Sequence, residues 1–88
     1  MKTDYYNTVV KKRAKVRQRI LARMKQMSGC VDCGYNENPL ALQFDHVRGT
    51  KKFHLSYAPY AYSMRVILDE MDKCVVRCAN CHMIKTHG

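Results

Sequence analysis

The sequence has no apolar stretch long enough for a signal peptide or a membrane span. It also contains no internal repeat and no low-complexity segment. These absences argue against a membrane protein and against a repeat protein. We expect instead one small domain of 88 residues that stays in a reducing cytosol.

Acidic residues are scarce. The chain has seven Asp and Glu against sixteen Lys and Arg, which gives a formal net charge of +9. This excess favours a polyanionic partner, with nucleic acid as the first candidate. A basic protein without a specific anion is the plain alternative. A membrane surface is a weaker one, since no aromatic-rich amphipathic face accompanies the charge.

The charge is concentrated near the N-terminus. Residues 11–25 contain eight basic residues and no acidic one, so no i,i+4 ion pair can form there. The spacing of the apolar residues predicts a helix that ends at Ser28-Gly29, with a narrow apolar stripe of Val16, Ile20, Met24 and Met27. A solvated helix face would explain the charge, but the lack of acids favours nucleic-acid binding by Lys11, Lys12, Arg13, Lys15, Arg17, Arg19, Arg23 and Lys25.

The rest of the chain reads as short elements in an α+β order. Alternating apolar and polar residues predict a strand over 42–47, and a long loop should follow it. A helix should begin after a Ser63 cap, with an inward face of Met64, Ile67, Leu68 and Met71. A second short strand over 73–77 and a final helix over 79–87 complete the expected order.

Two C-x-x-C pairs, Cys30/Cys33 and Cys78/Cys81, are separated by 44 residues. Each pair can form a tight turn that directs both thiolates at one point, so two facing turns would complete a tetrahedral zinc shell. A structural zinc would stabilise a domain whose own core is small. A redox or disulfide role is the alternative, although five cysteines cannot all pair within one chain. Cys74 remains, and we expect it to be a small core residue.

A second group of residues has a different chemistry. Asp45 and His46 lie at the end of the first predicted strand, and His82 follows directly after the last cysteine of the expected zinc site. A carboxylate can hold a divalent cation, and an imidazole can take a proton from water. Strand neighbours point to opposite faces unless the strand ends there and twists. His82 would be a second metal ligand if the zinc fixes the final helix against the strand.

Taken together, "CVDC", "FDHV" and "KCVVRCANCHMIKTH" resemble the HNH endonucleases, the zinc-stapled branch of the ββα-metal nucleases. The resemblance covers residues 30–87. It implies a ββα-metal core over 29–88 behind a basic helical arm over 1–28. It also implies His46 as the general base, Asp45 and His82 as ligands of Mg²⁺, Mn²⁺ or a similar cation, and a structural zinc. The implied substrate is DNA, cut by a monomer or a homodimer in a bacterial or phage-infected cell.

One position departs from that family. The family's middle Asn, which helps to orient the strand-end histidine, lies about five residues before the third zinc cysteine, where this chain has Lys73; Asn80 is not the same position. Contacts with phosphate are possible for His54, Lys73 and His87. Two other functions stay open at this point: a non-catalytic zinc module that binds nucleic acid, and a zinc scaffold for a protein partner.

Overall fold

The computed structural model describes residues 6–87, with side chains from Thr8 onward. The first five residues of the predicted arm and Gly88 lie outside this part. In chain order the elements are a π-helical turn η1 (Tyr6–Val10), helix α2 (Lys11–Ser28), a 3₁₀ turn η2 (Pro39–Ala41), strand β1 (Leu42–His46), helices α3 (Ala58–Ala61) and α4 (Met64–Met71), strand β2 (Cys74–Cys78) and helix α5 (Ala79–His87). This is a small α+β fold, as the sequence predicts.

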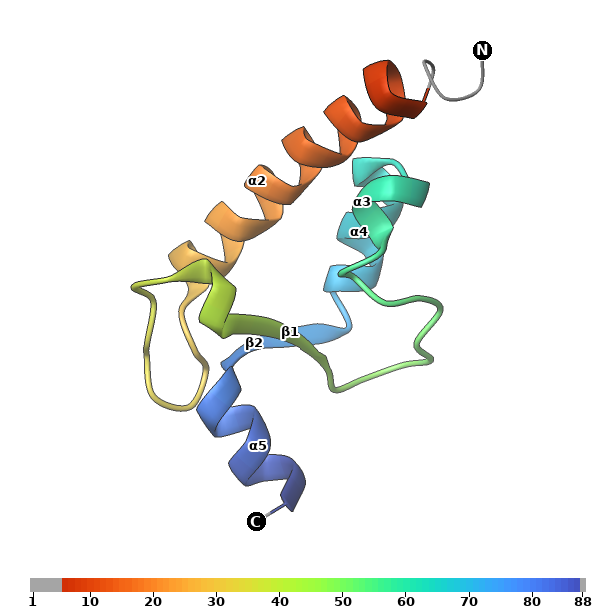
Figure 1. Cartoon of the computed structure of the whole chain (residues 1–88). Coiled ribbons are helices and arrows are strands. Elements are labelled where there is room, and N and C mark those ends of the chain that lie inside the picture. Colours follow the sequence, from red (N-terminus) through yellow and green to blue (C-terminus); the bar gives the residue numbers. More distant parts are fainter. Residues whose placement is uncertain (1–5, 88) are drawn as a thin grey trace.

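The centre of the fold is a two-stranded antiparallel sheet (Figure 1). Leu42 pairs with Cys78 at one end of the sheet and His46 pairs with Cys74 at the other. The predicted strands are confirmed, although β1 ends at His46, one residue earlier than expected, and β2 spans Cys74–Cys78 rather than 73–77. The backbone N–H of Val47 still donates to the carbonyl of Lys73 at 2.8 Å, so the chain leaves the sheet only after this bond.

Helix α2 ends where the sequence predicts, at Ser28 before Gly29, whose φ of 69° suits a residue without Cβ. The predicted apolar stripe is wrong, however. Val16 and Met27 are 53% and 77% exposed, and the helix buries Ala14 and Leu21 instead.

The reason for this error is the amphipathic character of two basic side chains. Arg17 Nη1 donates to the carbonyl of Pro59 at 3.1 Å, and Lys25 Nζ donates to the carbonyl of Leu42 at 3.1 Å. Long basic side chains can cover apolar surface with their alkyl stems while their charged ends reach polar atoms. The face that packs against the rest of the chain therefore includes two of the residues expected to bind nucleic acid.

Two small hydrophobic clusters hold the elements together. One joins α2, the loop, α3 and α4 through Leu21, Leu55, Ala58 and Ile67, and the other joins the sheet to the cysteine turns through Cys30, Leu42, Val76 and Cys78. Helix α3, around Pro59, lies within the segment expected to be a loop.

Helix α4 differs from the prediction on its inner face. It begins after Ser63, but the Ser63 side chain makes no capping hydrogen bond. Ile67 is fully buried as expected, whereas Leu68 is 41% exposed. Glu70 occupies the buried position instead, with only 1% of its surface exposed. The helix thus brings a carboxylate into the interior, which a periodicity of apolar residues does not predict.

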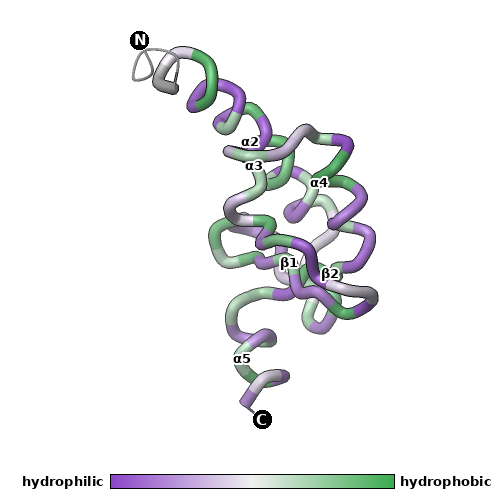
Figure 2. The backbone as a smooth tube through the Cα atoms, turned by 90° about the vertical axis from the view of Figure 1, so that its right-hand side faces the viewer, coloured by the Kyte–Doolittle hydropathy of each residue, from purple (hydrophilic) through white to green (hydrophobic). Residues whose placement is uncertain are grey.

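The first turns of α2 and the whole of α5 project from opposite ends of the molecule (Figures 1 and 2). Purple, hydrophilic residues recur along both projecting helices in Figure 2. Among the described residues, no helix combines the length and the hydrophobicity that spanning a bilayer requires.

Candidate metal centre and the polar residues around it

The four cysteines of the two C-x-x-C pairs meet at one end of the sheet. Their Sγ atoms all lie within 4.8 Å of one another. The first pair sits in a tight turn, in which Gly34 N–H donates to the carbonyl of Cys30 at 2.8 Å. The second pair spans the junction from β2 to α5, where Cys81 N–H points at the sulfur of Cys78 at 3.4 Å. The sequence prediction of a four-cysteine cluster is confirmed, and Cys74 takes no part in it.

The geometry and chemistry of the cluster fit zinc. A tetrahedral shell with Zn–S bonds of about 2.3 Å places its sulfurs about 3.8 Å apart. The sulfurs of Cys33 and Cys78 are 3.7 Å apart. Burial would raise the pKa of the Cys30 thiol, but backbone hydrogen bonds from Cys78, Cys33 and Asp32 lower it to about 6. The Cys78 thiol raises the pKa of Cys81, as expected for thiols that share a site without a cation. Zinc would remove this conflict by binding all four as thiolates.

Asp45 lies on the face of β1 that points away from the core clusters. Its Oδ2 accepts a hydrogen bond from Arg77 Nη1 at 2.5 Å, and Arg77 Nε donates to Asp32 Oδ2 at 2.8 Å. Arg77 pairs with Gln43 across the sheet, so it reaches Asp45 diagonally on the same face. Asp32 belongs to the first cysteine turn. One guanidinium therefore links the cysteine cluster to Asp45.

His82 lies on this same face, in the first turns of α5. Its Nδ1 hydrogen bonds to Oε1 of Gln43. Gln43 and Asp45 are two residues apart on one strand, so their side chains point in the same direction. The structure thus brings His82 to the face that carries Asp45, and Gln43 is the residue that orients its ring. With Nδ1–H donated to an amide oxygen, Nε2 carries the free electron pair of a neutral imidazole.

His46 points to the opposite face. Its Nε2 lies 2.9 Å from Oε2 of Glu70 on α4. The alternation of strand residues explains this, because His46 shares the inner face with Leu42 and Phe44. The sequence left open whether the end of the strand would turn Asp45 and His46 to one side. They are adjacent in the chain, but their side chains have separate partners on separate faces.

Glu70 is surrounded by donors. Its Oε1 accepts from Lys73 Nζ at 2.8 Å, and its Oε2 accepts from the backbone N–H of Lys52 at 3.0 Å as well as facing His46. The hydrogen bond from Lys73 is the main cause that lowers the pKa of Glu70 to about 2, against the opposing effect of burial. Glu70 is therefore a carboxylate at any pH near neutrality.

The other residues that the sequence predicts to contact phosphate or nucleic acid lie in different parts of the structure. His54 and His87 are exposed, on the loop and at the end of α5. Lys73 is half-buried, and its Nζ also donates to the carbonyl of Thr50 at 2.8 Å. Of the eight basic residues of α2, those exposed are Lys11, Lys12, Arg13, Lys15, Arg19 and Arg23.

Sequence reasoning did not find Gln43, Glu70 or Arg77. Gln43 could have been found as the residue two before Asp45 on the same strand face. Glu70 stands three residues after Ile67 on the predicted inward face of α4, so an acid at that position was a signal of a buried polar contact. Arg77 offered no local signal, since its two partners lie 45 and 32 residues away.

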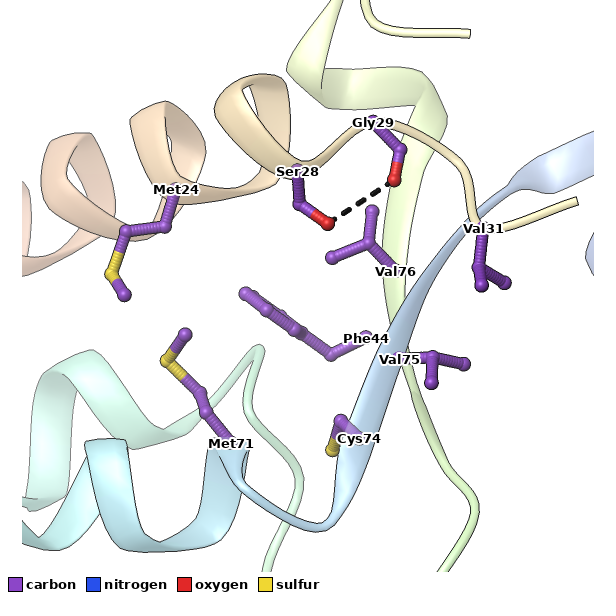
Figure 3. Close-up of a pocket in the computed structure, with 9 residues that line it drawn as sticks. All are labelled: Met24, Ser28, Gly29, Val31, Phe44, Met71, Cys74, Val75 and Val76. Carbon is purple, nitrogen blue, oxygen red and sulfur yellow. Dashed lines mark hydrogen bonds between the residues drawn. The ribbon is translucent and has the colours of Figure 1, made fainter. Parts of the chain in front are cut away.

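A cavity of about 400 Å³ lies on the inner side of the sheet, between α2, α4 and β2 (Figure 3). Met24, Phe44, Met71 and Val76 line it with apolar atoms. Burial, followed by the charges of Glu70 and Asp45, raises the pKa of the Cys74 thiol in its wall to about 11, so this thiol stays protonated. The lining of the cavity contains no charged side chain and no histidine. The polar residues with candidate chemistry lie elsewhere, around Asp45 and His46.

Comparisons of the chain with protein-family models, with curated proteins and with solved structures give no match in any of the three.

Proposed function

We propose that this protein is a metal-dependent endonuclease that hydrolyses DNA phosphodiester bonds, in the manner of the HNH enzymes that its sequence resembles. The observation that supports this most is the position of His82. His82 follows the second cysteine pair and lies beside Gln43, on the face of β1 that carries Asp45. It is not part of the cysteine cluster. A carboxylate and an imidazole from two different elements then share one open surface.

Asp45 and His82 are the proposed ligands of the catalytic cation. The carboxylate and Nε2 of an imidazole suit Mg²⁺ or Mn²⁺, and two protein ligands leave several coordination positions for water and phosphate oxygens. Within the part of the chain that the structure describes, the four cysteines form the one cluster of three or more His, Cys, Asp or Glu groups that could hold a metal. The proposed catalytic site has two protein ligands. A divalent cation bound there would polarise the phosphate and stabilise the leaving 3′ oxygen.

Arg77 contacts Asp45, one of the two proposed cation ligands. The guanidinium neutralises the carboxylate, and a cation would have to share or replace that contact. Because Arg77 also bonds to Asp32, it can keep one partner while the other changes. Asp45 therefore has a positively charged neighbour on the face that carries His82.

His46 is the proposed general base. It is the last residue of β1, directly after Asp45, and its Nε2 is engaged by Glu70. The other ring nitrogen, Nδ1, would accept the proton of the attacking water. A positioned base of this kind contributes about 10²- to 10⁴-fold in rate.

The DNA backbone would contact the outward face of α2. Lys12, Lys15, Arg19 and Arg23 follow one another at helical spacing on the side opposite to Leu21, and all four are exposed. Such a row can bind phosphates without reading sequence. Arg17 and Lys25 serve packing in the structure, so the proposed contact surface is narrower than the eight residues of the sequence prediction.

A non-catalytic zinc module that binds nucleic acid is the second candidate. One observation favours it: Asp45, His46 and His82 all have protein partners, and Asp45 and His46 point to opposite faces. A polar network of this kind can serve stability alone. It would retain the zinc and the basic row but would have no catalytic activity.

Cleavage of supercoiled plasmid separates the two candidates. The zinc-loaded protein should produce nicked or linear DNA with Mg²⁺ or Mn²⁺ and none with EDTA. His46→Ala should abolish cleavage while DNA binding and zinc content are retained, and Asp69→Asn, at an exposed position of α4, should cleave normally. Binding without cleavage under any divalent cation would replace the nuclease by the binding module.

A further inference from the structure

Glu70 is the most deeply buried charged side chain among the described residues, with 1% of its surface exposed. It faces three groups that come from three different places in the chain: the imidazole of His46 at the end of β1, the ammonium of Lys73 and the backbone N–H of Lys52 in the loop. A buried carboxylate is stable only when it is paired and hydrogen-bonded. Lys73 pairs with the charge of Glu70, and the N–H of Lys52 and Nε2 of His46 complete its hydrogen bonds.

The contacts of Glu70 determine which atom of His46 carries a hydrogen. Glu70 is ionised, because Lys73 holds its pKa at about 2, so its oxygens can only accept hydrogen bonds. The nitrogen of His46 that faces it is therefore a donor. In a neutral imidazole with hydrogen on Nε2, the electron pair lies on Nδ1.

We propose that Glu70 is the positioning residue for the base: with Lys73 it fixes His46 in the Nε2–H tautomer and leaves the electron pair of Nδ1 free to accept a proton. This inference rests on the proposed nuclease function. It also explains the one departure from the HNH pattern. Lys73 stands where that family has its orienting Asn, and in this chain the pair Glu70–Lys73 does the orienting instead. Lys73 is then part of the support of His46 rather than a phosphate ligand.

The geometry distinguishes a carboxylate from an amide at this position. Oε1 accepts from Lys73, and Oε2 accepts from both Lys52 N–H and His46. A glutamine has only one oxygen, so its NH₂ must face either the Lys73 ammonium or the Lys52 N–H and His46. In the second orientation the NH₂ donates to Nε2 and stabilises the other tautomer. Glu70→Gln is thus close in shape but wrong in hydrogen bonding, as when a carboxylate that orients a catalytic histidine becomes an amide.

The first test reads the tautomer directly and does not require activity. Nitrogen-15 NMR of the histidine rings in the zinc-loaded protein, above the pH at which imidazoles charge, should show His46 with hydrogen on Nε2 and an unprotonated Nδ1. The His46 signals are assigned by their loss in His46→Ala. Hydrogen on Nδ1 in the wild-type protein would overturn the inference. This spectrum tests the tautomer of His46 even if Glu70→Gln does not fold.

The second test measures the consequence for cleavage. Glu70→Gln should lower kcat by about 10²-fold or more, with little change in KM or in the divalent concentration for half-maximal rate. Asp69→Asn makes the same chemical change at the exposed neighbouring residue and should leave kcat unchanged. Unchanged kcat and tautomer in a folded, zinc-loaded Glu70→Gln would overturn the inference. If the wild-type protein has the Nε2–H tautomer but cleaves no DNA, the proposed nuclease function is wrong, and so is the catalytic role of Glu70. The role of Glu70 in fixing the His46 tautomer would still hold.

Discussion

Arg77 and Asp45 form an ion pair across the two strands, with 2.5 Å between Nη1 and Oδ2. The same guanidinium reaches Asp32 of the first cysteine turn through Nε, at 2.8 Å. Arg77 is buried, with 7% of its surface exposed. Its hydrogen bond to Asp32 is the main cause that raises the pKa of the guanidinium above its usual value. One side chain therefore couples the first cysteine turn to the proposed catalytic strand.

This coupling predicts that Arg77→Lys destabilises the protein. A lysine has one compact ammonium in place of a planar fork, so it cannot bond to both carboxylates in the same way. The thermal midpoint of the zinc-loaded variant, followed by circular dichroism, should fall below that of the wild type. Arg65→Lys, the same substitution at an exposed position of α4, is the matched control and should leave the midpoint unchanged. Equal midpoints for Arg77→Lys and the wild type would mean that the fork adds nothing to the fold.

Removal of the zinc should unfold the chain. Metal analysis of the purified protein should give one zinc per chain, and Ser in place of Cys30, Cys33, Cys78 or Cys81 should abolish both zinc binding and the helical signal, because a small domain with two small clusters depends on its metal. Cys74→Ser should retain the zinc, since Cys74 lies outside the cluster. Equal damage at Cys74, or a folded protein without zinc, would contradict the assignment.

Gln43 should control the affinity of the proposed catalytic cation. Gln43→Ala removes the hydrogen bond that orients His82, and the loss of such a support typically weakens metal binding by about 10- to 100-fold. Calorimetric titration of the zinc-loaded protein with Mn²⁺ measures the change without reference to cleavage. Gln26→Ala, which removes a glutamine bonded to the Glu37 carbonyl, is the control. Identical Mn²⁺ affinities in the two variants would argue against His82 as a ligand.

The basic row of α2 predicts the salt dependence of DNA binding. Gln at Lys12, Lys15, Arg19 and Arg23 should reduce the slope of log K against log salt by about 3.6, if each contacts one phosphate. Deletion of the whole helix is a poorer test, because Ala14 and Leu21 are buried. The double variants Lys15→Gln/Arg19→Gln and Lys51→Gln/Arg65→Gln remove equal charge, and only the first should lower the slope, by about 1.8. Equal slopes in the two double variants would assign α2 another role.

The lowered pKa of Glu70 predicts how stability depends on pH. A group whose pKa falls from 4.5 to about 2 on folding stabilises the folded state above pH 4.5, and this stabilisation is lost as the pH falls toward 2. The difference in free energy of unfolding between wild type and Glu70→Gln, measured in urea, should therefore shrink as the pH falls from about 4.5 toward 2. A difference that stays constant over this range would show that the pKa of Glu70 is not lowered on folding.

The sequence was sufficient for the features whose cause is local. The C-x-x-C spacing, the alternation in β1 and the Ser28-Gly29 helix end each involve residues a few positions apart, and the structure contains all three. The buried face of α2 was not predictable from apolar spacing, because Arg17 and Lys25 form part of it. The partner of His46 was not predictable either, since Glu70 lies 24 residues away and becomes its neighbour only through the pairing of the strands.

The position of Glu70 has a consequence for strand alignment. A slip of one residue between the two five-residue strands would turn every side chain of the slipped strand to the other face. In this protein a slip of β1 would bring Asp45 to Glu70, carboxylate against carboxylate, and would carry His46 to the outer face. The charge of Glu70 opposes this misalignment at the His46 end of the sheet. The carboxylate that holds His46 thus also opposes a one-residue slip of β1. Chains in which Glu70 is neutralised should therefore refold with a larger misaligned fraction.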